Sequence, residues 1–235
     1  GLGGGDRGVA VFCTLSGVLI TSLLAAEPES SGSAALGAFY PRRARRLLPA
    51  SVLLVLLVLI ASVITDWFDA VADLRAHIIG SLLQIATWVF LIGGGSYQEL
   101  LQQAAGAASP LEHYWSLAIE EQFYWLWPVA FVGLWKAGRS RRGRLVLLGA
   151  VTALFVVIAP ITAIVWGSDA AYWASPARAA EILFGALLAL AIAGRRVPDR
   201  WWVLAPISLA VLAICVVTFP SAGGPAYSGW LPAIG

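Results

Sequence analysis

The sequence contains no methionine, only 2 cysteines and few charged residues, and these shortages exclude several classes of protein. Charged residues make up 12% of the 235 residues, about half of the ~25% usual in soluble domains. Because 60% are hydrophobic, an ordinary soluble globular fold is excluded. Cys13 and Cys215 lie far apart in apolar stretches, so we expect two buried thiols and neither a disulfide framework nor a metal site.

Apolar segments are the main feature that the sequence does have. The mean hydropathy is +0.83, and a helix needs about 20 apolar residues to cross the hydrocarbon core of a membrane. The pattern predicts an all-α, polytopic integral membrane bundle with about six to seven membrane segments, in a single domain. The predicted segments are Val9–Ala26, Leu47–Thr65, Ile78–Ile92, Tyr114–Trp135, Leu145–Trp166, Ala179–Ala193 and Trp202–Thr218.

Basic residues gather in three predicted connecting loops, which the positive-inside rule places in the cytoplasm. Two segments separate the second loop from the third, as the rule requires, but three separate the first from the second. One segment in between therefore fails to cross, either Ile78–Ile92 or Tyr114–Trp135. The clusters are Arg42, Arg43, Arg45 and Arg46; Lys136, Arg139, Arg141, Arg142 and Arg144; and Arg195, Arg196 and Arg200.

A polar stripe follows one face of the fourth predicted segment. Residues three and four apart share a helix face, so His113, Ser116, Glu120 and Tyr124 are expected to line up. A carboxylate at membrane depth costs at least about 2.5–3.5 kcal/mol, so Glu120 and Glu121 should face a partner, water or the bundle interior. The alternative is an interfacial helix with hydrated glutamates and a belt of tryptophans.

Three smaller elements each allow a functional and a structural interpretation. The guanidiniums of residues 42–46 can bind phosphates, from lipid or from a nucleotide-type acyl carrier, or can simply anchor a membrane helix. Arg178 and Glu181 are three apart on a predicted helix, close enough for a structural ion pair or for part of a site. Ser16 and Gly17 place small residues in the first helix, which favours close helix packing.

Together these elements resemble the membrane acyltransferase 3 family, multi-helix proteins that acylate extracytoplasmic sugars and include the OatA-like and OafB-like O-acetyltransferases. The resemblance extends from the first residue to about residue 193. The family's His, Trp-Ser-Leu, Glu, Gln-Phe-Tyr and Pro pattern matches His113, Trp115–Leu117, Glu120, Gln122–Tyr124 and Pro128. Its other motifs resemble Ser16–Thr21, Arg43 and Arg46 before Pro49, and Arg178, Glu181 and Gly185.

The resemblance implies transfer of an acyl group, usually acetyl from acetyl-CoA, to a hydroxyl of a cell-envelope glycan or glycolipid. It implies a bacterial inner or plasma membrane, contact with lipid, an acyl-CoA substrate, no bound cofactor, no metal and no nucleic acid. The implied catalytic residues are His113, Trp115, Ser116 and Glu120; the acyl-CoA-binding residues are Arg43 and Arg46; the structural or path-lining residues are Ser16, Tyr124, Arg178 and Glu181.

The chain also departs from the family pattern. The family carries a basic residue and a histidine on a helix that would precede Gly1, and Ala10 replaces an acidic residue of the entry motif. His77, expected in a loop, does not match that histidine. The start at Gly1 without methionine indicates a fragment, so we expect this chain alone to be inactive. The alternatives are a transporter or flippase-like conduit, which would not bind CoA, and a noncatalytic remnant.

Overall fold

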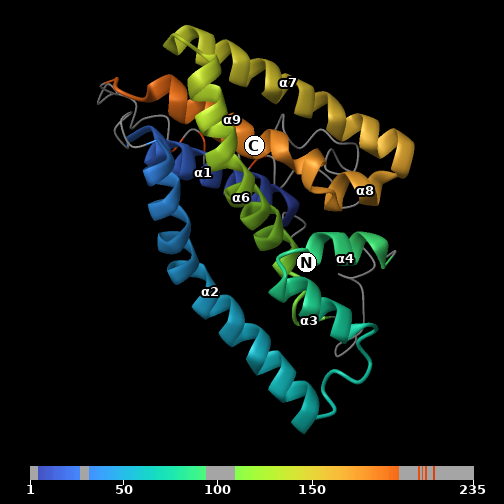
Figure 1. Cartoon of the computed structure of the whole chain (residues 1–235). Coiled ribbons are helices and arrows are strands. Elements are labelled where there is room, and N and C mark those ends of the chain that lie inside the picture. The colour runs from blue at the N-terminus through green and yellow to red at the C-terminus, as the bar shows by residue number, and fades with distance from the viewer. Residues whose placement is uncertain are drawn as a thin grey trace. The chain divides into compact units, whose positions relative to one another are not determined.

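The computed structural model describes residues 5–26, 32–93 and 109–195, together with residues 206, 208, 210 and 214. Within these ranges the chain forms helices and turns and no strand, which confirms the all-α prediction (Figure 1). Cys215 and most of the predicted segment Trp202–Thr218 lie outside the described residues. The helices are α1 (Gly5–Ala26), α2 (Gly32–Ile64), α3 (Leu74–Leu82), α4 (Ala86–Ile92), α6 (Tyr114–Ala137), α7 (Arg141–Trp166), α8 (Ser168–Trp173) and α9 (Ser175–Ile192).

Among the described residues, 4 helical stretches are long and apolar enough to cross a membrane. They carry large apolar side chains on their outer surface, for example Leu53 and Val63 of α2, which are 58% and 78% exposed. Such surfaces are stable against lipid rather than water. The chain is therefore a multi-pass membrane protein. The stretches are Gly8–Ala26, Phe39–Ile64, Arg141–Trp166 and Ser168–Ile192.

The predicted segment Ile78–Ile92 forms two short helices, α3 and α4, instead of one (Figure 1). The chain reverses at Gln84, whose φ of 58° lies in the left-handed region. A helix of 9 residues, the length of α3, is about 14 Å long, less than half of the ~30 Å hydrocarbon core. Ile78–Ile92 therefore does not cross as one helix. The other candidate, α6, is also not among the described stretches that are long and apolar enough to cross.

The prediction that residues 42–46 form a connecting loop is wrong, because α2 runs through them without interruption. The helix also contains Pro41 and Pro49, each of which removes one backbone N–H donor. The arginines, alanines and leucines between them have high helix propensity, and the Arg45 Nε donates to the Pro41 carbonyl at 3.3 Å. Residues 42–46, called the basic turn from here on, therefore lead directly into the apolar part of α2.

The chain divides into two compact units. In the first unit, α1 and α9 approach so closely that a Cβ atom on Gly17 would clash with the carbonyl of Ile182. A Cβ on Gly185 would likewise clash with the carbonyl of Thr14. The packing interpretation of the small residues in the first helix is thereby confirmed. This unit comprises Gly1–Ala26, Leu134–Tyr172 and Pro176–Gly235.

The second unit is built on a buried aromatic cluster. Trp173 stacks on Phe90 and meets Trp115 edge to face, each with ring centroids 5.3 Å apart. The hydroxyl of Thr87 in α4 donates to the Trp173 carbonyl. These contacts fix α4 and the first turn of α6 on the short 173–175 segment. The unit comprises Glu27–Gly133 and Trp173–Ser175.

Candidate active-site pocket between α2 and α6

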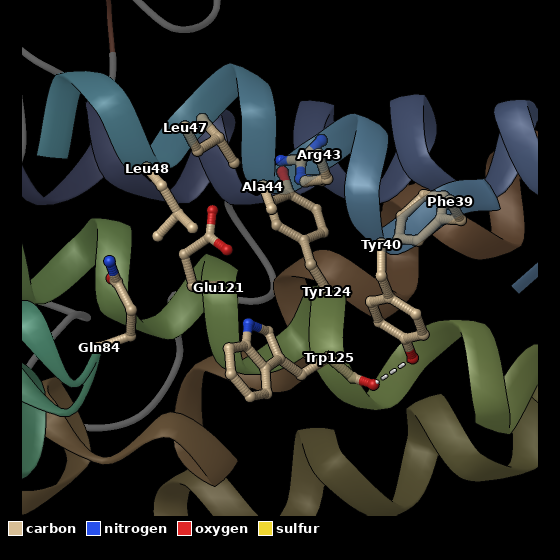
Figure 2. Close-up of a pocket in the computed structure, with 10 residues that line it drawn as sticks. All are labelled: Phe39, Tyr40, Arg43, Ala44, Leu47, Leu48, Gln84, Glu121, Tyr124 and Trp125. Atoms are coloured by element: carbon tan, nitrogen blue, oxygen red, sulfur yellow. Dashed lines mark hydrogen bonds between the residues drawn. The ribbon is translucent and has the colours of Figure 1, made fainter. Parts of the chain in front are cut away.

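A pocket of about 410 Å³ opens within the second unit, between the basic turn of α2 and the first half of α6 (Figure 2). Most of its wall is apolar or aromatic, and three side chains bring amide or charged groups to it. This combination of an apolar wall with a few polar groups is typical of small-molecule sites. The lining residues are Phe39, Tyr40, Arg43, Ala44, Leu47, Leu48, Gln84, Glu121, Tyr124 and Trp125.

Arg43 is the cationic group of the pocket. Its guanidinium carbon lies 3.3 Å from the centre of the Tyr124 ring, a cation–π contact that holds the side chain in place and is stronger where water is excluded. The Nε of Arg43 is buried and has no hydrogen-bond partner among the described residues. Arg43 therefore brings a positive charge to the pocket wall, with one buried N–H that is unsatisfied among the described residues.

Tyr124 connects the pocket to Glu120. The Tyr124 hydroxyl donates to the Glu120 Oε2 at 3.2 Å, and both residues are buried. The contact confirms the predicted alignment of these two residues on one helix face, four positions apart. Glu120 does not line the pocket itself. It lies one side chain away, behind the ring on which Arg43 rests.

Glu121 is the carboxylate that lines the pocket. It was expected, like Glu120, to face a partner, water or the bundle interior, but it was not among the predicted catalytic residues. Figure 2 shows its carboxylate pointing from α6 towards α2, where the positive charge of Arg43 acts on it. The spacing could have indicated this role, because Glu121, Tyr124 and Trp125 are three and four positions apart and so share the helix face that borders the pocket. The family motif contains the neighbouring Glu120 and implies no role for Glu121.

The two helices are joined directly at the pocket. The Tyr40 hydroxyl of α2 donates to the backbone carbonyl of Trp125 in α6 at 2.8 Å (Figure 2). This carbonyl would otherwise accept only from within its own helix. The bond and the Arg43–Tyr124 contact lie one turn apart on α2, so together they fix the register of α2 against α6.

The other predicted catalytic residues surround the first turn of α6. His113 is exposed and precedes the helix, so its predicted place on the helical stripe is wrong. The Ser116 hydroxyl donates to the His113 carbonyl at 3.2 Å, and Trp115 is buried against Trp173. None of the three lines the pocket. His77, predicted in a loop, lies in α3 with its ring 4.6 Å from that of Phe90.

The remaining predicted residues divide between the two units. Arg46 is exposed on α2 outside the pocket, and Ser16 is buried in α1. Arg178 and Glu181 form the expected ion pair in α9, with an Arg178 nitrogen 3.3 Å from the Glu181 Oε2 and side chains 1% and 0% exposed. The structure thus brings Arg43, Tyr124 and Glu120 together. It does not bring Arg46 into the same pocket.

The apolar helical spans and the pocket lined by arginine and glutamate define the class of the chain, a multi-pass membrane protein with a pocket beside two of its helices. Comparison with known proteins makes the class specific. The sequence model of the acyltransferase 3 family, described as an acyltransferase domain, matches residues 5–235. The chain therefore belongs to this family. No solved structure matches the chain.

Two curated relatives show how much of a longer protein the chain corresponds to. The peptidoglycan O-acetyltransferase OatA of Listeria monocytogenes is 32% identical over 225 residues, which make up 92% of this chain and 35% of OatA. YrhL of Bacillus subtilis is 34% identical over 207 residues, 84% of this chain and 31% of YrhL. The chain thus spans about a third of the length of these relatives.

Proposed function

We propose that this chain is the membrane domain of an O-acyltransferase that moves an acyl group, in the first place acetyl, from its CoA thioester to a hydroxyl of peptidoglycan. Membership of the acyltransferase family supports the reaction class. The name of the relative OatA supports acetyl as the group and peptidoglycan as the acceptor. Because the relatives are about three times as long, acceptor and donor are proposed for the whole gene product.

The observation that carries the proposal is the placement of Arg43 and Glu121 in one pocket with mostly apolar walls. Acyl transfer to a hydroxyl needs a base for the hydroxyl proton and a positive group for the charge that develops on the carbonyl oxygen. It also needs a site from which bulk water is excluded. Glu121 supplies the base, Arg43 supplies the positive group, and Leu47 and Leu48 contribute apolar wall.

In the proposed step, the acceptor hydroxyl oxygen attacks the thioester carbonyl carbon while its proton passes to the Glu121 carboxylate. The Arg43 guanidinium stabilises the negative charge on the carbonyl oxygen. Collapse of this intermediate restores the C=O double bond of the new ester and breaks the C–S bond, and the departing CoA sulfur takes the proton from Glu121. Glu120 is a positioning residue, because it holds the Tyr124 ring on which Arg43 rests.

The proposed donor lies along the basic turn of α2. Its pantetheine arm, with amide groups and an apolar dimethyl group, suits the pocket, whereas its phosphates would lie at the exposed guanidinium of Arg46. The exposed apolar face of α2 contacts membrane lipid. The catalytic roles predicted for His113, Trp115 and Ser116 stay proposals, and their position at the first turn of α6 places them beyond the pocket along that helix.

The test is acetyl transfer from acetyl-CoA to a muropeptide acceptor by the full-length gene product in proteoliposomes. We expect Glu121→Gln to lower kcat at least about 100-fold, the usual size of a general-base contribution. The matched control is Asp69→Asn, which neutralises an exposed carboxylate in the turn before α3 and should leave kcat unchanged. Full activity of Glu121→Gln would overturn the role of this base. A wild-type protein that binds no acetyl-CoA would overturn the donor and favour a conduit.

A further inference from the structure

The turn between α3 and α4 is closed in a strained form that places one glutamine at the pocket. The Ile85 N–H donates to the Gly80 carbonyl at 2.8 Å, and a Cβ on Gly80 would clash with the Val89 side chain. In this tight reversal Gln84 has a φ of 58°, a conformation that is unfavourable for residues other than glycine and asparagine. Such strain persists only where surrounding contacts hold it.

Gln122 of α6 supplies those contacts. Its side-chain nitrogen donates to the Gln84 backbone carbonyl at 2.9 Å. Its side-chain oxygen accepts from the Trp88 indole at 3.2 Å and from the Ser175 hydroxyl at 2.6 Å. One amide thus binds the α3–α4 turn, α4 and the 173–175 segment, all within the second unit. The two acceptor bonds also fix which end of the amide is oxygen.

The side chain of Gln84 lines the pocket, on the side away from Arg43 (Figure 2). Its Oε1 is buried and has no hydrogen-bond partner among the described residues. A buried acceptor without a partner is unfavourable. Gln84 therefore holds an unsatisfied acceptor in the pocket wall, and a small rotation of its side chain would present this acceptor to an N–H or O–H group in the pocket.

We propose that Gln84 contacts the acyl donor, by accepting a hydrogen bond from an amide N–H of its pantetheine arm, and that Gln122 is the positioning residue for Gln84. The inference rests on the proposed function. An amide N–H is favoured over a sugar hydroxyl because the wall beside Gln84 is apolar, as at Leu48, and a sugar ring would need several further polar partners. The contact explains why Gln84 is held in a strained turn.

The test compares two donors in the full-length gene product, acetyl-pantetheine and ethyl thioacetate, which has the same acetyl thioester but no amide. The main variant is Gln84→Gly, which removes the amide and also relieves the left-handed backbone, so the fold is kept or stabilised. We expect kcat/KM for acetyl-pantetheine to fall about three- to tenfold, the effect of one lost hydrogen bond. For ethyl thioacetate and for the KM of the glycan acceptor we expect no change.

Gln122→Glu tests the positioning role, because a carboxylate still accepts from Trp88 and Ser175 but no longer donates to Gln84. We expect the same loss, confined to acetyl-pantetheine and to the donor KM. Equal losses for both thioesters, a change only in the acceptor KM, or unchanged kinetics in a folded Gln84→Gly would each overturn the contact. These results leave the proposed function standing if Glu121→Gln is inactive. If Glu121→Gln is also fully active, the proposed function fails as well.

Discussion

In the described part of the chain, two arginine–glutamate sites use the same chemical groups in different ways. Arg178 and Glu181 stand three positions apart on α9, are 1% and 0% exposed, and contact each other at 3.3 Å. Arg43 and Glu121 come from different helices, are half-buried and share the wall of a pocket. The first pair lies beside the close crossing of α1 and α9 at Gly185. The second lies where two helices border a cavity of about 410 Å³.

The difference shows what separates a structural ion pair from two opposite charges that share a cavity. A buried pair is tolerated when each charge compensates the other, and it then has little left to offer a substrate. A pair split across a cavity must leave room for a third group, so its charges act on whatever enters. Changes at the first site should therefore affect stability, and changes at the second should affect acetyl transfer.

The largest effect is expected from Glu181→Ala, which leaves the charge of Arg178 in a buried site without its carboxylate. Loss of one member of a buried pair typically costs about 3–5 kcal/mol, so the thermal midpoint in detergent should fall sharply. The double variant Arg178→Met, Glu181→Leu should recover most of that stability, because well-packed apolar residues often replace a buried pair without loss. A double variant as unstable as the single one would contradict this expectation, because it would show that the pair stabilises the fold through more than mutual charge compensation.

The second largest effect is expected when the pocket is partly filled by a larger side chain. Ala44→Trp adds an indole to the pocket wall without changing any charge, so it should raise the KM for acetyl-CoA by roughly tenfold or more, about 1.4 kcal/mol. Its control is Ala50→Trp, an equally large addition at an exposed position of α2 outside the pocket. The measurements are the KM for acetyl-CoA and the thermal midpoint of both variants. An equal KM in Ala44→Trp and Ala50→Trp would mean that the pocket does not hold the donor.

The smallest effect concerns a lone carboxyl that belongs to neither pair. Burial raises the pKa of Glu112 above its usual value of 4.5, and the nearby His113 opposes this shift. Above pH 4.5 the unfolded chain loses this proton before the folded one does, so stability decreases as the pH rises towards the folded pKa. Glu112→Gln has no carboxyl group at this position, so its stability does not decrease for this reason as the pH rises. Its thermal midpoint should therefore exceed that of the wild type more at pH 8 than at pH 4, and a pH-independent difference would contradict the shift.

Local features of the fold could be predicted from the sequence. Helical spacing predicted the Arg178–Glu181 pair, and the small residues around Gly17 indicated close packing, because both depend on neighbours along a helix. The reversal at Gln84 was missed, since an apolar run such as Ile78–Ile92 has no glycine or proline at the break. The placement of residues 42–46 in a loop was wrong, because positive charge indicates a membrane edge and not the end of a helix.

The pocket could be predicted only in part, for a physical reason. Arg43 and Glu120 were selected from motifs, but which carboxylate faces Arg43 depends on how α6 is rotated against α2. That rotation is set by tertiary contacts such as the bond from Tyr40 to the Trp125 carbonyl. Spacing within one helix cannot show this rotation. Gln84 reaches the pocket through the turn between α3 and α4, far along the chain from both helices.

The most direct test of the account is the dissociation constant of acetyl-CoA for the purified full-length gene product in nanodiscs, with and without the Arg43 guanidinium. We expect Arg43→Ala to weaken binding at least about tenfold, as for a lost charged hydrogen bond, while the thermal midpoint falls only by the small amount expected for one lost cation–π contact. Arg139→Ala, which removes an exposed basic residue between α6 and α7, should bind like the wild type. Wild-type affinity in a folded Arg43→Ala would contradict the assignment of this pocket to the acyl donor.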